Sequence, residues 1–153
     1  LDKDFGLAYA KSQIAAGNSL PTKGLAFISL QDKHKNEGIN LAKKLVELNF
    51  TLCGTAGTAD IIKKNGIKCK KVNKVSGGSP HIVDILNSKK IALVINTGGG
   101  KPNLAVQDSS DLRRATLINK IPYCTTLAAA NACIEAINSL KNKKITVKAI
   151  QEL

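Results

Sequence analysis

Apolar residues occur in two alternating patterns along the chain. Short apolar stretches at residues 25–30, 50–53, 67–72, 91–95 and 121–125 are typical of strands buried on both faces. Between them, apolar residues recur at helical spacing, which predicts helices over 4–16, 39–48, 57–65, 80–87, 109–119 and 130–140. This order predicts a Rossmann-like α/β fold with three layers, α/β/α, around a five-stranded parallel sheet.

Two further segments complete the predicted fold. Three consecutive glycines at 98–100 favour a flexible loop from Thr97 to about Asp108, and Asp108 or Ser109 then caps the next helix. A P-loop is rejected here, because that motif needs Ser or Thr after Lys101, and Pro102 follows instead. A short extra strand is predicted at the edge of the sheet over 146–150.

The composition narrows the classes of function. The 153 residues fit one ordinary domain, and no apolar run approaches the roughly 20 residues that a membrane-spanning helix needs. The net charge is +12, but 21 of the 23 basic residues are lysines and only 3% of residues are aromatic. Nucleic-acid readers usually carry more arginine and more aromatic side chains. We therefore assign most of this charge to solvated surface and expect no nucleic-acid partner, keeping a basic nucleic-acid-binding module as an alternative.

The cysteines and histidines predict no metal site. The four cysteines form no CxxC pair, and the two histidines do not complete a zinc pattern. Because Cys53, Cys69, Cys124 and Cys133 lie in or beside apolar segments, we interpret them as small buried side chains of a reduced protein.

The residues that follow the predicted strands are the candidate site, since ligands of parallel α/β sheets bind beyond the carboxyl ends of the strands. Thr55, Gly57 and Thr58 stand at the start of a helix and offer hydroxyls, backbone N–H groups and the positive end of a helix dipole. Lys35 and Lys74 come from neighbouring loops, and two lysines at a helix N-terminus fit a phosphomonoester. The simpler alternative is that Thr58 is only a helix cap.

Several sequence motifs resemble one enzyme family. They are DFGLAYAKSQ at 4–13, VNKV at 72–75, PHIVD at 80–84, INT at 95–97, LRR at 112–114 and TTL at 125–127. In this order they resemble the C-terminal part of the large subunit of carbamoyl phosphate synthetase, bacterial type, over essentially the whole chain. The resemblance implies that residues 1–22 are the tail of the preceding ATP-binding synthetase domain. It also implies that residues 23–153 form a methylglyoxal-synthase-like allosteric domain.

The resemblance also implies a ligand and its site. In bacterial members such a domain binds UMP as inhibitor and IMP as activator. The positions that would hold the effector phosphate, or phosphate itself, are Ser29, Lys35, Thr55, Gly57, Thr58 and Lys74. Asn96, Thr97 and Gly98 would face the ribose and base, although Gly98 lacks a hydroxyl that relatives often carry there. Tyr123 and Thr125 match the border of an ornithine site.

The parent enzyme that the resemblance implies is a cytoplasmic, glutamine-dependent ligase. It makes carbamoyl phosphate for pyrimidine and arginine synthesis from bicarbonate, glutamine and ATP, with Mg or Mn. Its partners would be the remaining synthetase domains and the small glutaminase subunit. The domain itself would hold no cofactor, no metal and no catalytic residue, and would contact no membrane.

Two enzymes of related fold remain as alternatives. Methylglyoxal synthase needs an aspartate base after a Gly-Gly pair, whereas here Gly77 and Gly78 are followed by Ser79, which has no suitable pKa. IMP cyclohydrolase shares the serine of the first strand and the Gly-Thr helix start, but its Lys- and His-rich stretch is not found after the third strand. His81 is therefore interpreted as structural.

Overall fold

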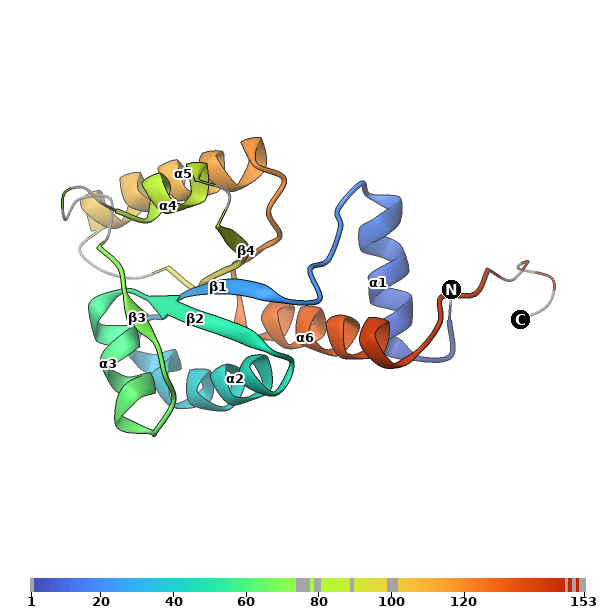
Figure 1. Cartoon of the computed structure of the whole chain (residues 1–153). Helices are drawn as coiled ribbons and strands as arrows, with labels where there is room; N and C mark the ends of the chain where they lie inside the picture. Colours follow the sequence, from blue (N-terminus) through green and yellow to red (C-terminus); the bar gives the residue numbers. More distant parts are fainter. Residues whose placement is uncertain are drawn as a thin grey trace.

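The computed structural model describes residues 2–73, 78, 81–88, 90–98, 102–147, 149 and 151, with backbone only over 102–108. Helices and strands alternate along this chain (Figure 1). The first half comprises α1 (Phe5–Ala15), β1 (Gly24–Ser29), a 3-10 turn η1 (Asp32–His34), α2 (Lys35–Glu47), β2 (Phe50–Gly54) and α3 (Ala56–Lys64). The second half comprises β3 (Lys70–Lys71), α4 (Ile82–Asn87), β4 (Ile91–Asn96), α5 (Pro102–Ile118), β5 (Tyr123–Cys124) and α6 (Leu127–Asn142).

The five strands form one parallel sheet in the order β3-β2-β1-β4-β5. Successive β1 side chains point to opposite faces, so Ala26 and Ile28 pack in one core and Phe27 packs in the other. The first core is closed by α2, α3 and α6, and the second by α4 and α5, as Figure 1 shows. The predicted three-layer α/β/α fold with a five-stranded parallel sheet is thus confirmed.

The strands at both edges are shorter than the apolar stretches indicated. β3 contains two residues because only Cys53 and Gly54 of β2 pair with it, and β5 pairs only with Val94 and Ile95 of β4. The extra edge strand predicted over 146–150 is wrong for its described residues, 146, 147 and 149, which are not in a strand. Val147 is 96% exposed, so nothing packs there to hold a strand.

The loop predicted from Thr97 to about Asp108 is also wrong in its second half. α5 begins at Pro102, so neither Asp108 nor Ser109 caps it. Proline suits the first position of a helix because its φ is already helical and its missing N–H has no partner to lose. The same proline that excluded a P-loop therefore marks the start of this helix.

Asp4 fastens the first helix to the last. Its carboxylate accepts hydrogen bonds from the Leu7 N–H at 2.8 Å and the Ser139 hydroxyl at 2.9 Å, and forms an ion pair with Lys143. A Cβ at Gly6 would lie 2.4 Å from the Ser139 oxygen, so α1 and α6 pack too closely for a larger residue. α1 therefore packs closely against α6.

This arrangement predicts a pH dependence of stability. The hydrogen bond from Lys143, followed by those from Leu7 and Ser139, lowers the pKa of Asp4 from 3.8 to about 2. A carboxyl with a depressed folded pKa stabilises the protein above its unfolded pKa and loses that contribution as the pH falls through the folded value. In urea unfolding between about pH 5 and pH 2, the stability advantage of the wild type over Asp4→Asn should shrink as the pH falls. A constant difference across that range would contradict this role for Asp4.

Candidate functional site

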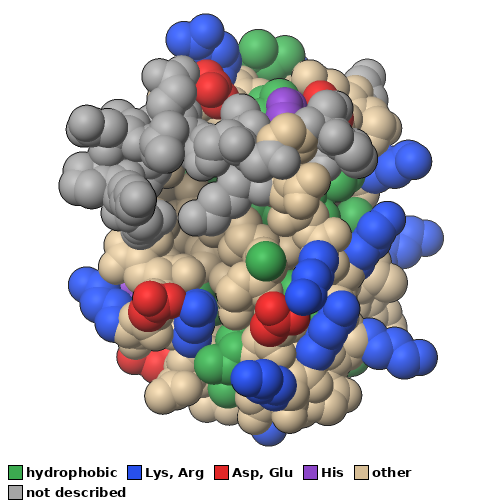
Figure 2. Space-filling view, turned by 90° about the vertical axis from the view of Figure 1, so that its left-hand side faces the viewer, with side chains coloured by type: hydrophobic (Ala, Val, Ile, Leu, Met, Phe, Trp, Pro, Cys, Tyr) green, Lys and Arg blue, Asp and Glu red, His purple; other side chains and the backbone are tan. Residues whose placement is uncertain are grey.

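The carboxyl ends of β1, β2 and β4 meet at one edge of the sheet. Ile28 is paired with Gly54, and Ser29 is paired with Asn96, so the residues that follow these strands are neighbours. Figure 2 views the molecule from this end and shows basic and acidic side chains close together on the described surface. The structure therefore brings Ser29, Thr55 and Asn96 together at the edge where the sequence places the site.

Buried hydroxyls fix the start of α3 against the end of β1. The Thr58 hydroxyl accepts a hydrogen bond of 3.0 Å from the Leu30 N–H, and Thr58 is only 1% exposed. The Thr55 hydroxyl lies 3.3 Å from that of Thr58 and 3.5 Å from that of Ser29. The Thr58 side chain is thus a brace between two elements, and its backbone N–H is the group it presents at the helix start.

Lys35 reaches the first turn of α3. A Cβ built on Gly57 would lie 3.1 Å from the Lys35 Nζ atom, so the ammonium group sits directly over this glycine. The Lys35 Nζ atom also lies 2.6 Å from the carboxylate of Asp32, whose side chain is 94% exposed. A cation, a bare glycine and the positive end of a nine-residue helix therefore converge, which is an arrangement that favours an anion.

Gln31 joins the ends of β1 and β4 and was not predicted from the sequence. Its backbone N–H donates to the Thr97 hydroxyl at 3.0 Å, and its side-chain amide donates to the Thr97 carbonyl at 2.8 Å. The Gly98 N–H donates to the Asn96 side chain at 3.2 Å, and Gly98 has a φ of 72°, which favours glycine. The only signal for Gln31 was its position directly after the first strand, because no motif includes it.

Asn96 connects this edge to Tyr123. The Asn96 side-chain amide donates to the Tyr123 hydroxyl at 3.0 Å. Tyr123 also lines a cavity of about 510 Å³ whose walls include Tyr9 of α1 and Arg113 of α5. Thr125 is exposed beside β5. A single hydrogen bond thus links the predicted nucleotide side of the domain with the predicted border to a neighbouring domain.

Several predicted positions lie outside the described residues. Lys74 is one of them, and so are Gly77, Ser79, Pro80 and residues 99–101. His81 is described: its backbone N–H donates to Asp84 at 2.9 Å before the start of α4, which agrees with a structural role.

The described residues offer little other chemistry at this edge. Burial raises the pKa of the Cys53 thiol to about 12 and that of Cys69 to about 11, which keeps these thiols protonated and unreactive near neutral pH. All four cysteines are free and buried, as predicted. Over the described part of the chain, no three His, Cys, Asp or Glu side chains gather as a metal site would require, and no helix is long and apolar enough to cross a membrane.

The brace at Thr58 can be tested by substitution. Thr58→Val keeps the shape of the side chain but leaves the buried Leu30 N–H without its acceptor, which should lower the free energy of unfolding by about 1–3 kcal/mol. Thr58→Ser retains the hydroxyl and is the matched control. Urea unfolding of the three proteins measures the effect, and equal losses in both variants would assign the cost to packing instead.

Comparison with known proteins places the chain in a family. The family model described as "MGS-like domain" matches residues 37–125. The carbamoyl phosphate synthase large chain of Mesorhizobium japonicum is 44% identical over 152 residues, covering 99% of this chain and 13% of that protein. The large chain's "C-terminal section" from Methanopyrus kandleri is 45% identical over 154 residues, covering 100% of this chain and 28% of that protein.

A solved structure agrees with the fold. The methylglyoxal synthase of Elizabethkingia anophelis superimposes with a TM-score of 0.57 over 83% of this chain and 95% of that protein, at 17% identity. At this identity the likeness concerns the fold alone. The chain spans less than a third of the two large-chain relatives, 13% and 28% of their lengths. From the matched family model and the parallel sheet that carries it, the chain belongs to the family of MGS-like domains and is similar to the C-terminal section of the carbamoyl phosphate synthase large chain.

Proposed function

We propose that this chain is the regulatory, effector-binding domain of a carbamoyl phosphate synthase large chain and that it binds UMP or IMP through their phosphate. The single observation that carries the proposal is the Lys35 ammonium group over Gly57 at the start of α3. Residues 1–22 would derive from the preceding synthetase domain and residues 23–153 would form the regulatory domain. The domain would perform no chemistry itself.

The first turn of α3 suits a phosphate. Thr55 occupies the N-cap position, but its side chain makes no capping hydrogen bond and instead faces the hydroxyls of Ser29 and Thr58. The backbone N–H groups of the first turn therefore remain free to donate to a ligand, and Lys35 supplies a positive charge beside them. Lys74 is proposed as the second cation of this site.

The ribose and base would lie toward the end of β4. Asn96, Thr97 and Gly98 form the adjoining wall, which Gln31 holds in place through its two hydrogen bonds to Thr97. Gly98 has no side chain, and its N–H already donates to the Asn96 side chain, so this position would give a sugar hydroxyl space without a side-chain partner of its own. The choice between UMP and IMP would be made on this wall, away from the phosphate.

Exposed apolar side chains support the proposal that this chain packs against a neighbouring domain. Phe5 and Ile14 of α1 are 60% and 49% exposed, and Leu117 and Ile118 of α5 are 73% and 74% exposed. Such side chains suit packing against another domain. In the parent enzyme we assign that role to the preceding synthetase domain, with the ornithine border at Tyr123 and Thr125. The hydrogen bond between Asn96 and Tyr123 would let effector and border respond to each other.

The parent enzyme would make carbamoyl phosphate from bicarbonate, glutamine and ATP, with Mg or Mn, together with a small glutaminase subunit in the cytoplasm. A thermal-shift panel with UMP, IMP, phosphate, ornithine and N-acetylglutamate tests the effector class, because a ligand that binds only the folded state raises the melting temperature. Stabilisation by UMP, IMP and phosphate supports the proposal. Stabilisation by N-acetylglutamate alone contradicts it.

Lys35→Ala should weaken UMP binding by roughly 1.5–3 kcal/mol, the range for a hydrogen bond to a charged group. Lys74→Ala should do the same. Lys43→Ala on the exposed side of α2 removes the same charge and should leave the affinity unchanged. Calorimetric titration of UMP measures all four proteins, and an unchanged affinity in Lys35→Ala removes this lysine from the site.

Gly57→Ala separates binding from folding. The added methyl group would meet only the mobile end of Lys35, at 3.1 Å from Nζ, so the fold should tolerate it. Alanine also exceeds glycine in helix propensity by about 1 kcal/mol, so urea unfolding should show equal or greater stability. The methyl group would occupy the space of a phosphate oxygen, and UMP affinity should fall. Full affinity in this variant would place the phosphate elsewhere.

A further inference from the structure

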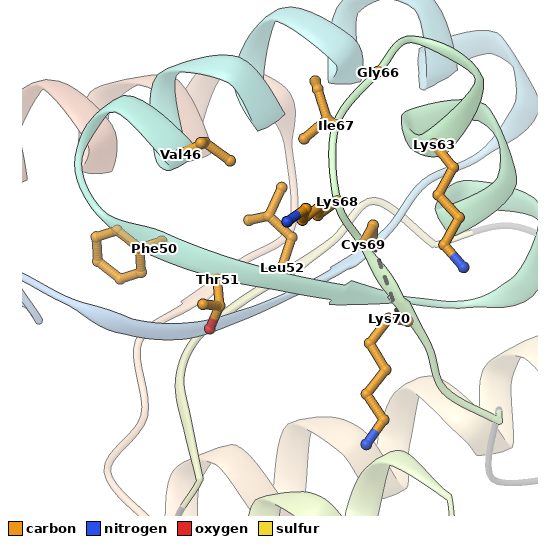
Figure 3. A pocket seen from close by; sticks show the side chains of 10 residues that line it. All are labelled: Val46, Phe50, Thr51, Leu52, Lys63, Gly66, Ile67, Lys68, Cys69 and Lys70. Carbon is orange, nitrogen blue, oxygen red and sulfur yellow. Dashed lines mark hydrogen bonds between the residues drawn. The ribbon is translucent and has the colours of Figure 1, made fainter.

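A groove of about 870 Å³ lies at the amino-terminal half of β2, at the opposite end of this strand from the proposed phosphate site. Figure 3 shows it between the end of α2, the start of β2 and the segment that leads from α3 to β3. Val46, Leu52 and Ile67 face its interior. Val46 is 44% exposed, although it lies on a helix whose other large apolar side chains are buried or partly buried.

The groove exists because β3 is too short to cover its neighbour. β1 pairs with β2 along residues 50–54, whereas β3 pairs only with Cys53 and Gly54. Among the described residues, no strand lies beside residues 50–52 on the side facing β3. The Gly54 carbonyl accepts from the Val72 N–H at 2.9 Å on that side, and main-chain groups alternate in direction along a parallel strand. The main-chain N–H and C=O groups of Leu52 therefore face the groove, just before the two residues of β2 that pair with β3.

The rim of the groove is positively charged. Lys63, Lys68 and Lys70 line it and are exposed, and none of them forms an ion pair with another described residue. Lys71 is the neighbouring lysine that does, at 2.7 Å from Asp60. In Figure 3, the Lys68 side chain lies close to Leu52, Lys63 lies above the β2 ribbon and Lys70 extends below it. An apolar floor with cations on its rim is complementary to a segment that carries both apolar and acidic side chains.

We propose that this groove is a docking surface for an extended acidic segment of a partner protein. The segment would pair with the open edge of β2 at residues 50–52, insert an aliphatic side chain among Val46, Leu52 and Ile67, and place carboxylates beside Lys63, Lys68 and Lys70. Addition of a strand to an exposed sheet edge draws affinity from main-chain hydrogen bonds and specificity from alternating side chains. Lysines at a sheet edge also discourage pairing with the edges of other sheets. That effect applies to strands that carry no acidic side chains, whereas an acidic strand would be attracted.

A synthetic heptapeptide that alternates Glu and Val, blocked at both ends and fluorescently labelled, is the direct probe. We expect saturable binding by fluorescence anisotropy at low salt, with amide shifts in nuclear magnetic resonance spectra confined to residues 46–52 and 63–71. Lys68→Glu should weaken it about fivefold, the effect of roughly 1 kcal/mol at a partly exposed charge pair. Val46→Asp should weaken it as well.

Three controls decide the outcome. Lys90→Glu, which makes the same charge change before β4 on the far side of β1, should leave the affinity unchanged. A peptide that alternates Lys and Val should not bind, and a peptide of Glu alone should bind more weakly because it lacks the apolar side chains. The proposal would be overturned if Lys68→Glu and Lys90→Glu lost the same affinity, or if the Glu-only peptide bound equally well. Amide shifts outside the groove would also overturn it. Because the proposed phosphate site lies at the other end of β2, these results are independent of UMP binding.

Discussion

The buried hydrogen bond from the Leu30 N–H to the Thr58 hydroxyl determines how the candidate site is assembled. It joins the end of β1 to the first turn of α3, two segments that lie 28 residues apart in the chain. With that junction fixed, Lys35 at the start of α2 is carried to a position over Gly57, and Ser29 is carried beside Thr55. A buried N–H needs an acceptor, so the threonine hydroxyl is required for folding before it is available to any ligand.

Contacts at the carboxyl ends of these strands also explain how ligand binding could affect a distant part of the domain. The ends of β1 and β4 are joined through Gln31 and Thr97, and Asn96 continues the chain of contacts to Tyr123. Coupling between two sites requires that each ligand favour one of two arrangements of the connecting groups. The amide of Asn96 is such a connecting group, because it contacts the Gly98 backbone on one side and the Tyr123 hydroxyl on the other.

The sequence allowed the central strands to be predicted well because they are long apolar stretches, as at residues 91–95. The edge strands were predicted poorly. β3 and β5 each pair with their neighbour through only two residues, and the other apolar residues of these stretches pack in the core without pairing in the sheet. The start of α5 at Pro102 was missed because a glycine run precedes it. For the site, Lys35 and Gly57 were predicted to converge and do, whereas Gln31 acts through tertiary contacts that carry no local signal.

The central claim is that the phosphate of a nucleotide binds at the first turn of α3. The most direct measurement is a titration of the ¹⁵N-labelled chain with UMP, followed through the backbone amides by nuclear magnetic resonance. The account predicts that the largest shifts fall on Ala56, Gly57 and Thr58, and that inorganic phosphate moves the same amides in the same direction. Shifts centred on any other part of the chain, with these three amides unmoved at saturation, would contradict it.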